Sequence, residues 1–170
     1  MVVHNIEPLY SADSKILILG SFPSVKSREE GFFYAHPQNR FWKVIAAIFG
    51  EEPPHTVDEK KSLILNRKLA VYDVIYSCEI TGSSDSSVKN VCPSNLKPII
   101  ENSKITKIFV NGRTAEKYYK KYALKEVGQD CIVLPSTSPA NAAYSLERLI
   151  SEWRVIKDEL NSCSKNSAGE

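Results

Sequence analysis

A run of apolar residues from Ile16 to Leu19 stops at Gly20, and a long loop then extends to a helical pattern that begins at Phe41. A short, continuous apolar run that ends at glycine is typical of a strand covered on both faces. The loop contains a proline turn and three consecutive aromatic residues. Because open α/β sheets place ligand sites at the carboxyl ends of their strands, the sequence predicts a buried strand over residues 15–20 that leads into a functional loop.

Strand-like and helical patterns alternate along the rest of the chain. Further strands are predicted at residues 69–75, 106–110 and 130–134. Helices are predicted at residues 40–49, 56–69, 93–102 and 142–160, with a basic helix after Gly112. We therefore predict an α/β fold, a three-layer α/β/α sandwich around a mainly parallel sheet of about four strands. Right-handed crossovers place the loops after the strands along one edge, so residues 20–38, 111–113 and 135–141 should meet in one cleft.

The chain has the length and apolar content of a single domain. It holds 170 residues, of which 42% are hydrophobic, enough for one sizeable core. We expect one domain over residues 1–160 and a disordered polar tail over residues 161–170. No apolar run is long enough to cross a bilayer, and the first residues lack the regions of a signal peptide. We expect a cytoplasmic monomer without a membrane partner.

Patterns that bind cofactors are missing from the sequence. The four cysteines, Cys78, Cys92, Cys131 and Cys163, are scattered, which favours reduced thiols and leaves a metal between Cys78 and Cys92 as a minor alternative. The sequence contains neither a glycine-rich phosphate loop nor a pair of histidines spaced for a metal. We expect no metal and no organic cofactor, and the sequence argues against a nucleoside triphosphatase or a conventional dinucleotide enzyme.

Basic residues are concentrated in residues 104–125. Seven lysines and arginines stand there against one acid, although the net charge of the whole chain is only +2. Such a concentration suits a surface that faces phosphates. A solvated helix face is an equally good interpretation of this feature alone.

Three segments that follow predicted strands carry the remaining chemistry. They are Gly20-Ser21-Phe22-Pro23-Ser24, Tyr34-Ala35-His36-Pro37-Gln38-Asn39-Arg40-Phe41-Trp42 and Leu134-Pro135-Ser136-Thr137-Ser138-Pro139-Ala140-Asn141. Together they resemble the uracil-DNA glycosylase superfamily over nearly the whole chain. The second segment is similar to the mismatch-specific uracil/thymine-DNA glycosylases, and the first and third are similar to the hypoxanthine-DNA (deoxyinosine) glycosylase branch. The resemblance implies the α/β/α fold and hydrolysis of an N-glycosidic bond in damaged DNA.

The resemblance places the catalytic role on Asn39. The mismatch-specific branch carries an asparagine in its first motif, where this chain has Phe22. In the hypoxanthine branch the asparagine of the second segment takes over the orientation of the water. An asparagine carbonyl can hold a water by accepting its hydrogen, although it cannot remove a proton as a carboxylate could. The alternative is that Asn39 only caps the helix that begins near Phe41.

Three further residues are expected to contact the base. By the resemblance, Tyr34 stacks on a base flipped out of the duplex, and Phe22 forms the floor or wall of the pocket. Asn111 ends a predicted strand, where its amide could donate to O6 of hypoxanthine and accept from N1–H. Adenine does not satisfy that pairing. A hairpin turn at Asn111-Gly112 is the alternative.

The third segment resembles the superfamily loop that enters the minor groove and fills the space left by the flipped nucleotide. We assign DNA contacts to Arg113 and to Ser136, Ser138, Pro139, Ala140 and Asn141, because hydroxyls and exposed N–H groups suit phosphates. The wedge would be Ala140 or Asn141, which is smaller than the usual leucine. The alternative is an ordinary loop with Asn141 as a helix N-cap.

We therefore predict a monofunctional DNA glycosylase that excises hypoxanthine from double-stranded DNA in base excision repair and leaves an abasic site. Its partner is DNA that contains a deaminated base. The motifs place no catalytic lysine, so lyase activity is not expected. The first alternative is a G:U/G:T mismatch-specific uracil/thymine-DNA glycosylase, and the second is a DNA-binding relative without catalysis.

Overall fold

A four-stranded parallel sheet forms the centre of the molecule. The structure, a computed structural model, describes residues 1–81 and 88–168, with side chains up to residue 162. The strands are β2 (Ile16–Gly20), β3 (Leu69–Asp73), β6 (Lys107–Asn111) and β7 (Ile132–Leu134), in the spatial order β3-β2-β6-β7. Every residue of β2 is buried, because β3 and β6 pair with its two edges and helices cover its faces. The predicted α/β class and parallel sheet are confirmed.

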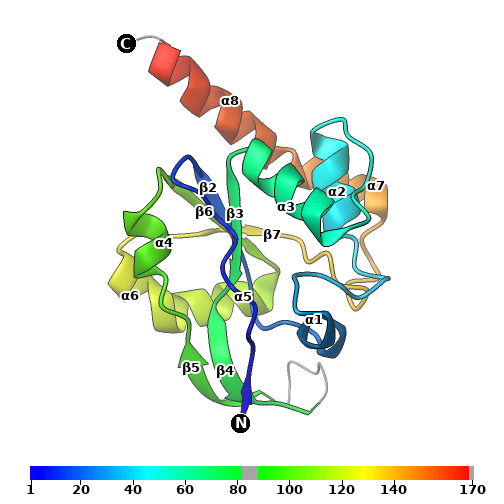
Figure 1. Cartoon of the computed structure of the whole chain (residues 1–170), viewed down its shortest axis with the longest axis vertical. Coiled ribbons are helices and arrows are strands. Elements are labelled where there is room, and N and C mark those ends of the chain that lie inside the picture. Colours follow the sequence, from blue (N-terminus) through cyan, green and yellow to red (C-terminus); the bar gives the residue numbers. More distant parts are fainter. Residues whose placement is uncertain (82–87, 169–170) are drawn as a thin grey trace.

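Helices lie on both faces of this sheet (Figure 1). One side holds α2 (Phe41–Ile48), α3 (Val57–Asn66) and α7 (Leu146–Trp153). The other side holds α4 (Lys97–Glu101), α5 (Arg113–Tyr118) and α6 (Leu124–Val127), and a π-helical turn, Tyr119–Ala123, joins α5 to α6. Helix α2 forms where apolar residues recur at three- and four-residue spacing, and it buries Val44, Ile45 and Ile48 against the core. The result is the predicted three-layer arrangement.

A second, antiparallel sheet was not predicted from the sequence. It contains β1 (Val2–Val3), β4 (Ile75–Glu79) and β5 (Lys89–Pro93), in the order β1-β4-β5. Strand β4 begins directly after Val74, so the single strand predicted at residues 69–75 is β3 followed by the start of β4. The apolar run continues through the buried Val74 and gives no sign of this change of sheet. A short helix after β2, α1 (Val25–Glu30), was not predicted either.

The long helix predicted at residues 142–160 is two helices. Helix α7 begins at Leu146, where Ser145 caps it by accepting a hydrogen bond from the backbone N–H of Arg148. Helix α8 (Val155–Ala168) follows and projects away from the rest of the molecule (Figure 1). Residues 161–168 of the tail that was expected to be disordered belong to this helix, and residues 169–170 lie outside the described part of the chain. Neither proline nor glycine occurs within α8, so nothing in this segment stops the helix.

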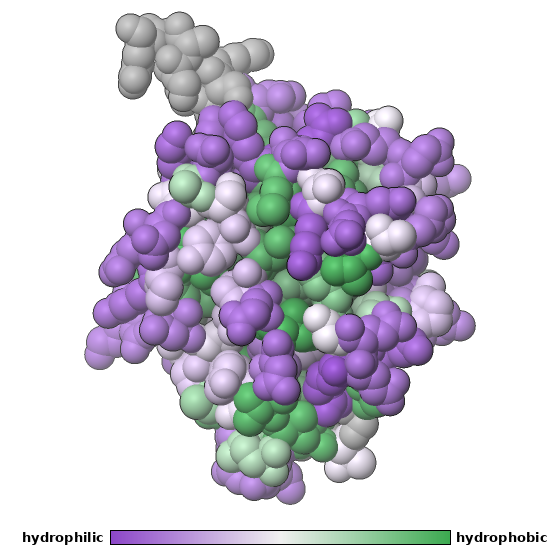
Figure 2. Space-filling view, viewed as in Figure 1, coloured by the Kyte–Doolittle hydropathy of each residue, from purple (hydrophilic) through white to green (hydrophobic). Residues whose placement is uncertain are grey.

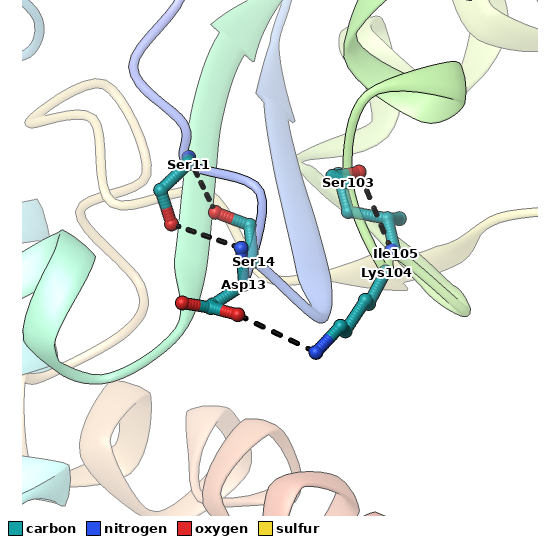
Figure 3. Close-up of polar contacts among 6 residues, drawn as sticks. All are labelled: Ser11, Asp13, Ser14, Ser103, Lys104 and Ile105. Carbon is teal, nitrogen blue, oxygen red and sulfur yellow. Dashed lines mark hydrogen bonds and ion pairs between the residues drawn. The ribbon is translucent and has the colours of Figure 1, made fainter.

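Polar contacts close the amino end of the sheet, opposite the predicted loops (Figure 3). The Ser14 hydroxyl accepts a hydrogen bond from the Ser11 N–H, and Lys104 Nζ lies 3.4 Å from Asp13 Oδ1. Lys104 precedes β6, whereas Arg113 follows it at the other end of the strand. The first of the basic residues in 104–125 and Arg113 therefore lie at opposite ends of β6.

The outer surface is mostly hydrophilic in the view of Figure 2. Apolar residues appear between the polar ones and gather at the lower end, over the small antiparallel sheet. Met1 and Val3 are among the exposed apolar side chains of the protein. Within residues 1–81 and 88–168, no helix combines the length and apolar character needed to cross a membrane.

Candidate active site

A cavity of about 810 Å³ lies at the carboxyl end of the parallel sheet. Its walls come from the loops that follow β2, β6 and β7 and from the end of β3, which confirms that the three predicted loops meet. Nine of the predicted site residues line it: Phe22, Tyr34, Asn39, Asn111, Arg113, Ser136, Ser138, Ala140 and Asn141. Pro139 is exposed beside them and is not part of the lining.

Thr137 joins the two predicted asparagines in one hydrogen-bond network. Its Oγ1 donates to Asn39 Oδ1 over 2.8 Å and accepts from Asn111 Nδ2 over 3.0 Å. Its backbone N–H donates to Asn111 Oδ1 over 3.0 Å. Thr137 is fully buried, so water does not compete for these bonds. The segments after β2, β6 and β7 therefore fix one another's polar side chains. Thr137 stood inside the third segment but was not predicted as a site residue.

The carbonyl oxygen of Asn39 is already engaged within the protein. Besides the Thr137 hydroxyl, Oδ1 accepts a hydrogen bond from the backbone N–H of Phe41 over 2.9 Å. Asn39 thus helps to cap α2, although Arg40 is the N-cap residue. Its Nδ2 makes no hydrogen bond to the described part of the chain. The Asn39 amide therefore offers the cavity a donor rather than the free acceptor that the sequence predicted.

The Asn111 amide is likewise held at both ends, by Thr137. Thr137 uses one Nδ2 hydrogen, and the Asn111 side chain also lies close enough to the Tyr34 hydroxyl to influence it. A hairpin at this position is wrong, because Gly112 is the N-cap residue of α5 and has a φ of 95°. A Cβ built on Gly112 would lie 3.0 Å from Ser136 Cβ. Glycine therefore lets the end of β6 approach the loop after β7.

Tyr34 has a left-handed backbone, with a φ of 51°. Its ring stacks on Phe41 with centroids 3.9 Å apart and planes inclined by 21°, so only the other ring face can meet a base. Its buried hydroxyl has no hydrogen-bond partner within the described residues. Burial raises the pKa of Tyr34 well above its ordinary value, so the phenol is neutral. Left-handed conformations outside glycine are uncommon and cluster at functional sites.

Phe22 and His36 complete the wall on the same side of the cavity. Phe22 is partly buried, with the Arg28 guanidinium 5.5 Å from its ring centroid. His36 Nδ1 accepts a hydrogen bond from the Gln38 N–H over 3.1 Å, and its carbonyl accepts from the Asn39 N–H over 2.9 Å. His36 therefore shapes the turn that presents Asn39.

A buried carboxyl group, Asp73, was not predicted as a site residue. It ends β3 beside Gly20 of β2, lines the cavity and is only 4% exposed. Its Oδ2 has no hydrogen-bond partner among the residues that the structure describes. Burial raises the pKa of Asp73 to about 7. The sequence did contain a signal for this residue, because Asp73 is the acidic last residue of an otherwise mostly apolar strand.

Arg40 fastens the loop after β7 to the start of α2. Its guanidinium donates to the carbonyl oxygens of Ser138 over 3.0 Å, of Asn141 over 3.1 Å and of Tyr144. Its backbone N–H donates to the Thr137 carbonyl over 3.1 Å. A planar guanidinium with several donors suits such a fork of carbonyls. The second and third segments of the sequence are therefore one structural unit.

The tip of this loop exposes Pro139 and Ala140. Asn141 is turned inward, because its Nδ2 donates to the Ser136 carbonyl over 3.0 Å. The alternative of Asn141 as a helix N-cap is wrong, since α7 begins at Leu146. Of the two predicted wedge residues, Ala140 is thus the exposed one.

Arg113 stands at the start of α5 with 83% of its side chain exposed, and its Nη1 lies 3.1 Å from Glu116 Oε1. Metal ligands do not gather near it or elsewhere in the described ranges, where no three His, Cys, Asp or Glu side chains form a group. Cys78, Cys92 and Cys131 are free thiols.

Known proteins are similar to this chain in sequence and in fold. Residues 7–158 match the family model of the uracil DNA glycosylase superfamily. A hypoxanthine DNA glycosylase from Methanosarcina acetivorans is 31% identical over 158 residues, which cover 92% of this chain and 98% of that protein. One from Methanosarcina barkeri is 29% identical over 150 residues, 86% of this chain and 92% of its own. The solution NMR structure of a uracil DNA glycosylase candidate from M. acetivorans has a TM-score of 0.80 at 29% identity, covering 95% of this chain and 99% of its own.

Proposed function

The chain belongs to the uracil-DNA glycosylase superfamily, and we propose that it is a monofunctional DNA glycosylase that hydrolyses the N-glycosidic bond of deoxyinosine and releases hypoxanthine. Two relatives named hypoxanthine DNA glycosylase align with most of the chain, which supports this choice. Phe22 supports it too, because a first-motif asparagine of the mismatch-specific uracil design is absent at that position. No metal or organic cofactor is part of the proposal.

The network of Asn39, Thr137 and Asn111 is the observation that carries the proposal. Breaking an N-glycosidic bond develops positive charge on the sugar and negative charge on the departing base. A site for this reaction needs an oriented water and donors to the base, both fixed before the substrate arrives. The buried network provides two amides in fixed orientations on the wall of one cavity.

Asn39 positions the attacking water through its Nδ2 group. Because Phe41 and Thr137 hold Oδ1, the amide N–H donates to the water oxygen, and a lone pair of that oxygen is free to attack C1′ of the sugar. An amide cannot remove the water proton, so we expect a modest catalyst.

Tyr34 stacks on the flipped base with the ring face that Phe41 leaves uncovered. Phe22 forms the wall of the base pocket, and the second Nδ2 hydrogen of Asn111 donates to O6 of hypoxanthine. An amide donor at O6 opposes adenine, which carries an amino donor there. Base recognition thus needs only one hydrogen of Asn111, fewer contacts than the sequence suggested.

The loop after β7 contacts the DNA backbone. Ser136 and Ser138 face the phosphates, Pro139 and Ala140 enter the minor groove, and Asn141 holds the loop in shape. Arg113 grips the strand from the rim of the cavity. We place this activity on double-stranded DNA in the cytoplasm, with residues 1–160 acting as one domain and as a monomer.

Single-turnover assays on matched duplexes test the proposal. Duplexes with one deoxyinosine, one deoxyuridine or neither are incubated with excess protein, and alkali then cuts the abasic sites. We expect wild type to act on deoxyinosine in preference to deoxyuridine, and Asn39→Ala to lower the rate roughly 100-fold or more. Asn66→Ala, which changes an exposed asparagine at the end of α3, should keep the wild-type rate.

Two other outcomes would contradict the proposal. Cleavage of deoxyuridine alone would transfer the protein to the mismatch-specific uracil branch. Cleavage of neither duplex would indicate a DNA-binding relative without catalysis. An unchanged rate in Asn39→Ala would restrict Asn39 to its capping role at α2.

A further inference from the structure

Asp73 lines the cavity at the carboxyl end of β3, next to Tyr34. A Cβ built on Gly20 would stand 2.6 Å from Asp73 Oδ1 and 2.9 Å from the Tyr34 hydroxyl oxygen, so both oxygens border the same glycine. Tyr34 is the ring assigned to stack on the base, whereas Asn39, assigned to the water, is bonded to Phe41 and Thr137. The carboxyl group therefore lies beside the ring that is assigned to stack on the purine.

The fold itself makes little use of this carboxyl group. Asp73 is only 4% exposed, and its Oδ2 has no hydrogen-bond partner. Within the described residues, Asp73 takes part in no ion pair. Burying a polar group without a partner costs free energy. Oδ2 itself is enclosed, but Asp73 belongs to the cavity wall, so a substrate group can meet this carboxyl group only through the small part of it that is exposed.

We propose that Asp73 is a catalytic acid that gives its proton to a ring nitrogen of the departing purine. This assignment rests on the glycosylase function proposed above. As the bond between C1′ and N9 breaks, its electron pair moves into the purine ring, and the carboxyl proton passes to a ring nitrogen. Hypoxanthine then leaves as a neutral base, and Asp73 is left as a carboxylate.

Water completes the reaction at the sugar. The oxygen of the water held by Asn39 bonds to C1′ and releases a proton to solvent, and Asp73 regains a proton from solvent. One water is consumed, and one hypoxanthine and one abasic sugar are formed. Asn39 and Asp73 thus divide the work, since the amide cannot transfer a proton and the carboxyl group can.

The surroundings of Asp73 suit an acid that works near neutral pH. Its burial raises the pKa to about 7, so a large fraction of the molecules carries the proton there. Tyr34 and Tyr72 are the titratable groups that sense its charge, and burial raises the pKa of both, so both stay neutral. Four other ionisable side chains line the cavity, and none of them forms an ion pair with Asp73: His36, Arg113, Tyr144 and Glu152.

The pH dependence of single-turnover excision from a deoxyinosine duplex tests the acid. Between about pH 5.5 and pH 8.5, we expect the wild-type rate to be highest at low pH and to fall roughly tenfold per pH unit above the pKa of Asp73. Asp73→Asn keeps the shape and a hydrogen-bond donor but has no proton to transfer. Its rate should be roughly 100-fold lower at about pH 6 and nearly independent of pH.

Two controls separate catalysis from folding and binding. Asp58→Asn, which changes an exposed aspartate of α3, should keep the wild-type rate and profile. Asp73→Asn should bind a cleavage-resistant 2′-fluorinated deoxyinosine duplex within about threefold of wild type. If thermal unfolding shows that Asp73→Asn is not folded, Asp73→Ser takes its place. A wild-type rate that does not change with pH would by itself contradict the role of Asp73 as an acid.

The outcomes distinguish this assignment from the proposed function. In one outcome, wild type cleaves deoxyinosine while Asp73→Asn keeps the wild-type pH dependence. That result would contradict the role of Asp73 as an acid and would leave the proposed glycosylase activity standing. No cleavage by wild type would overturn the proposed function and the acid with it. A slow, pH-independent Asp73→Asn with normal binding would support both.

Discussion

At the scale of single residues, Thr137 sets the orientation of two amides with one hydroxyl group. Rotation of either Asn39 or Asn111 would break a buried hydrogen bond. Leaving a buried polar group without its partner costs about 1–3 kcal/mol. On the proposed mechanism, Thr137 is a positioning residue, because it holds the two amides that are assigned to the water and the base.

Thr137→Val replaces the hydroxyl by a methyl group of similar size. Asn39 Oδ1 and Asn111 Nδ2 would then lose a partner, and we expect the single-turnover rate on deoxyinosine to fall at least about tenfold. Thr137→Ser keeps the hydroxyl and should stay within about threefold of wild type. Equal rates for the two variants would contradict the positioning role.

Asp73 also makes a prediction about stability. Its pKa is raised from 3.8 to about 7 by burial, so between these values the folded state holds a proton that the unfolded state has lost. The free energy of unfolding should therefore fall as pH rises through this window, by at most about 4 kcal/mol from this group. Denaturant unfolding of Asp73→Asn should show that this part of the slope is gone. A constant difference between Asp73→Asn and wild type at about pH 4 and about pH 8 would contradict the burial of an ionisable group there.

At the scale of elements, the start of α2 and the loop after β7 form one unit. Arg40 donates to three carbonyl groups of that loop, and Asn39 bonds to Thr137 within it. Trp153 of α7 donates from its indole N–H to the Pro135 carbonyl over 2.9 Å and holds the loop from its other side. The exposed tip of the loop, Pro139 and Ala140, is therefore flanked by residues whose backbone carbonyl groups are hydrogen-bonded.

Arg40→Lys tests this unit. One ammonium group cannot reproduce the fork of donors, so we expect the free energy of unfolding to fall by about 1–3 kcal/mol and the loop to become more sensitive to protease. Arg67→Lys is the matched control, because Arg67 makes an exposed ion pair with Glu51, and it should change stability by less than about 0.5 kcal/mol. Equal losses in the two variants would argue against the clamp.

Elements with a clear period could be predicted from the sequence. The continuous apolar run of β2 and the three- and four-residue spacing of α2 both report burial, and both elements lie within about one residue of their expected bounds. The breaks at Val74 and Arg154 could not be predicted, because the apolar pattern continues across both. The resemblance pointed to Asn39, and the end of a predicted strand pointed to Asn111. The hydroxyl between them depends on a contact across 98 residues, which no local pattern records.

At the scale of the whole molecule, the two ends of the parallel sheet differ in what they carry. The amino end carries polar contacts such as that of Lys104 with Asp13 (Figure 3). The carboxyl end holds the cavity. Arg113 and Lys104 come from the same basic stretch of sequence and lie at opposite ends of β6. We therefore expect DNA bound at the cavity to contact Arg113 rather than Lys104.

Salt dependence of DNA binding separates these two residues. We expect Arg113→Ala to weaken binding to a cleavage-resistant deoxyinosine duplex and to reduce the slope of log affinity against log salt by about one. Lys104→Ala removes a similar ion-paired surface cation and should leave the slope unchanged. A lower slope in Lys104→Ala alone would place the DNA at the wrong end of the sheet.

Identification of the released base tests the proposed activity most directly. Wild-type protein is incubated with a duplex that carries one deoxyinosine, and the small products are separated by chromatography and identified by mass. We expect free hypoxanthine in an amount equal to the abasic sites formed. Two results would contradict the assignment of this chain as a hypoxanthine-DNA glycosylase. In the first, wild type forms no more abasic sites or free hypoxanthine than Asn39→Ala does. In the second, the protein releases only uracil, from a matched deoxyuridine duplex.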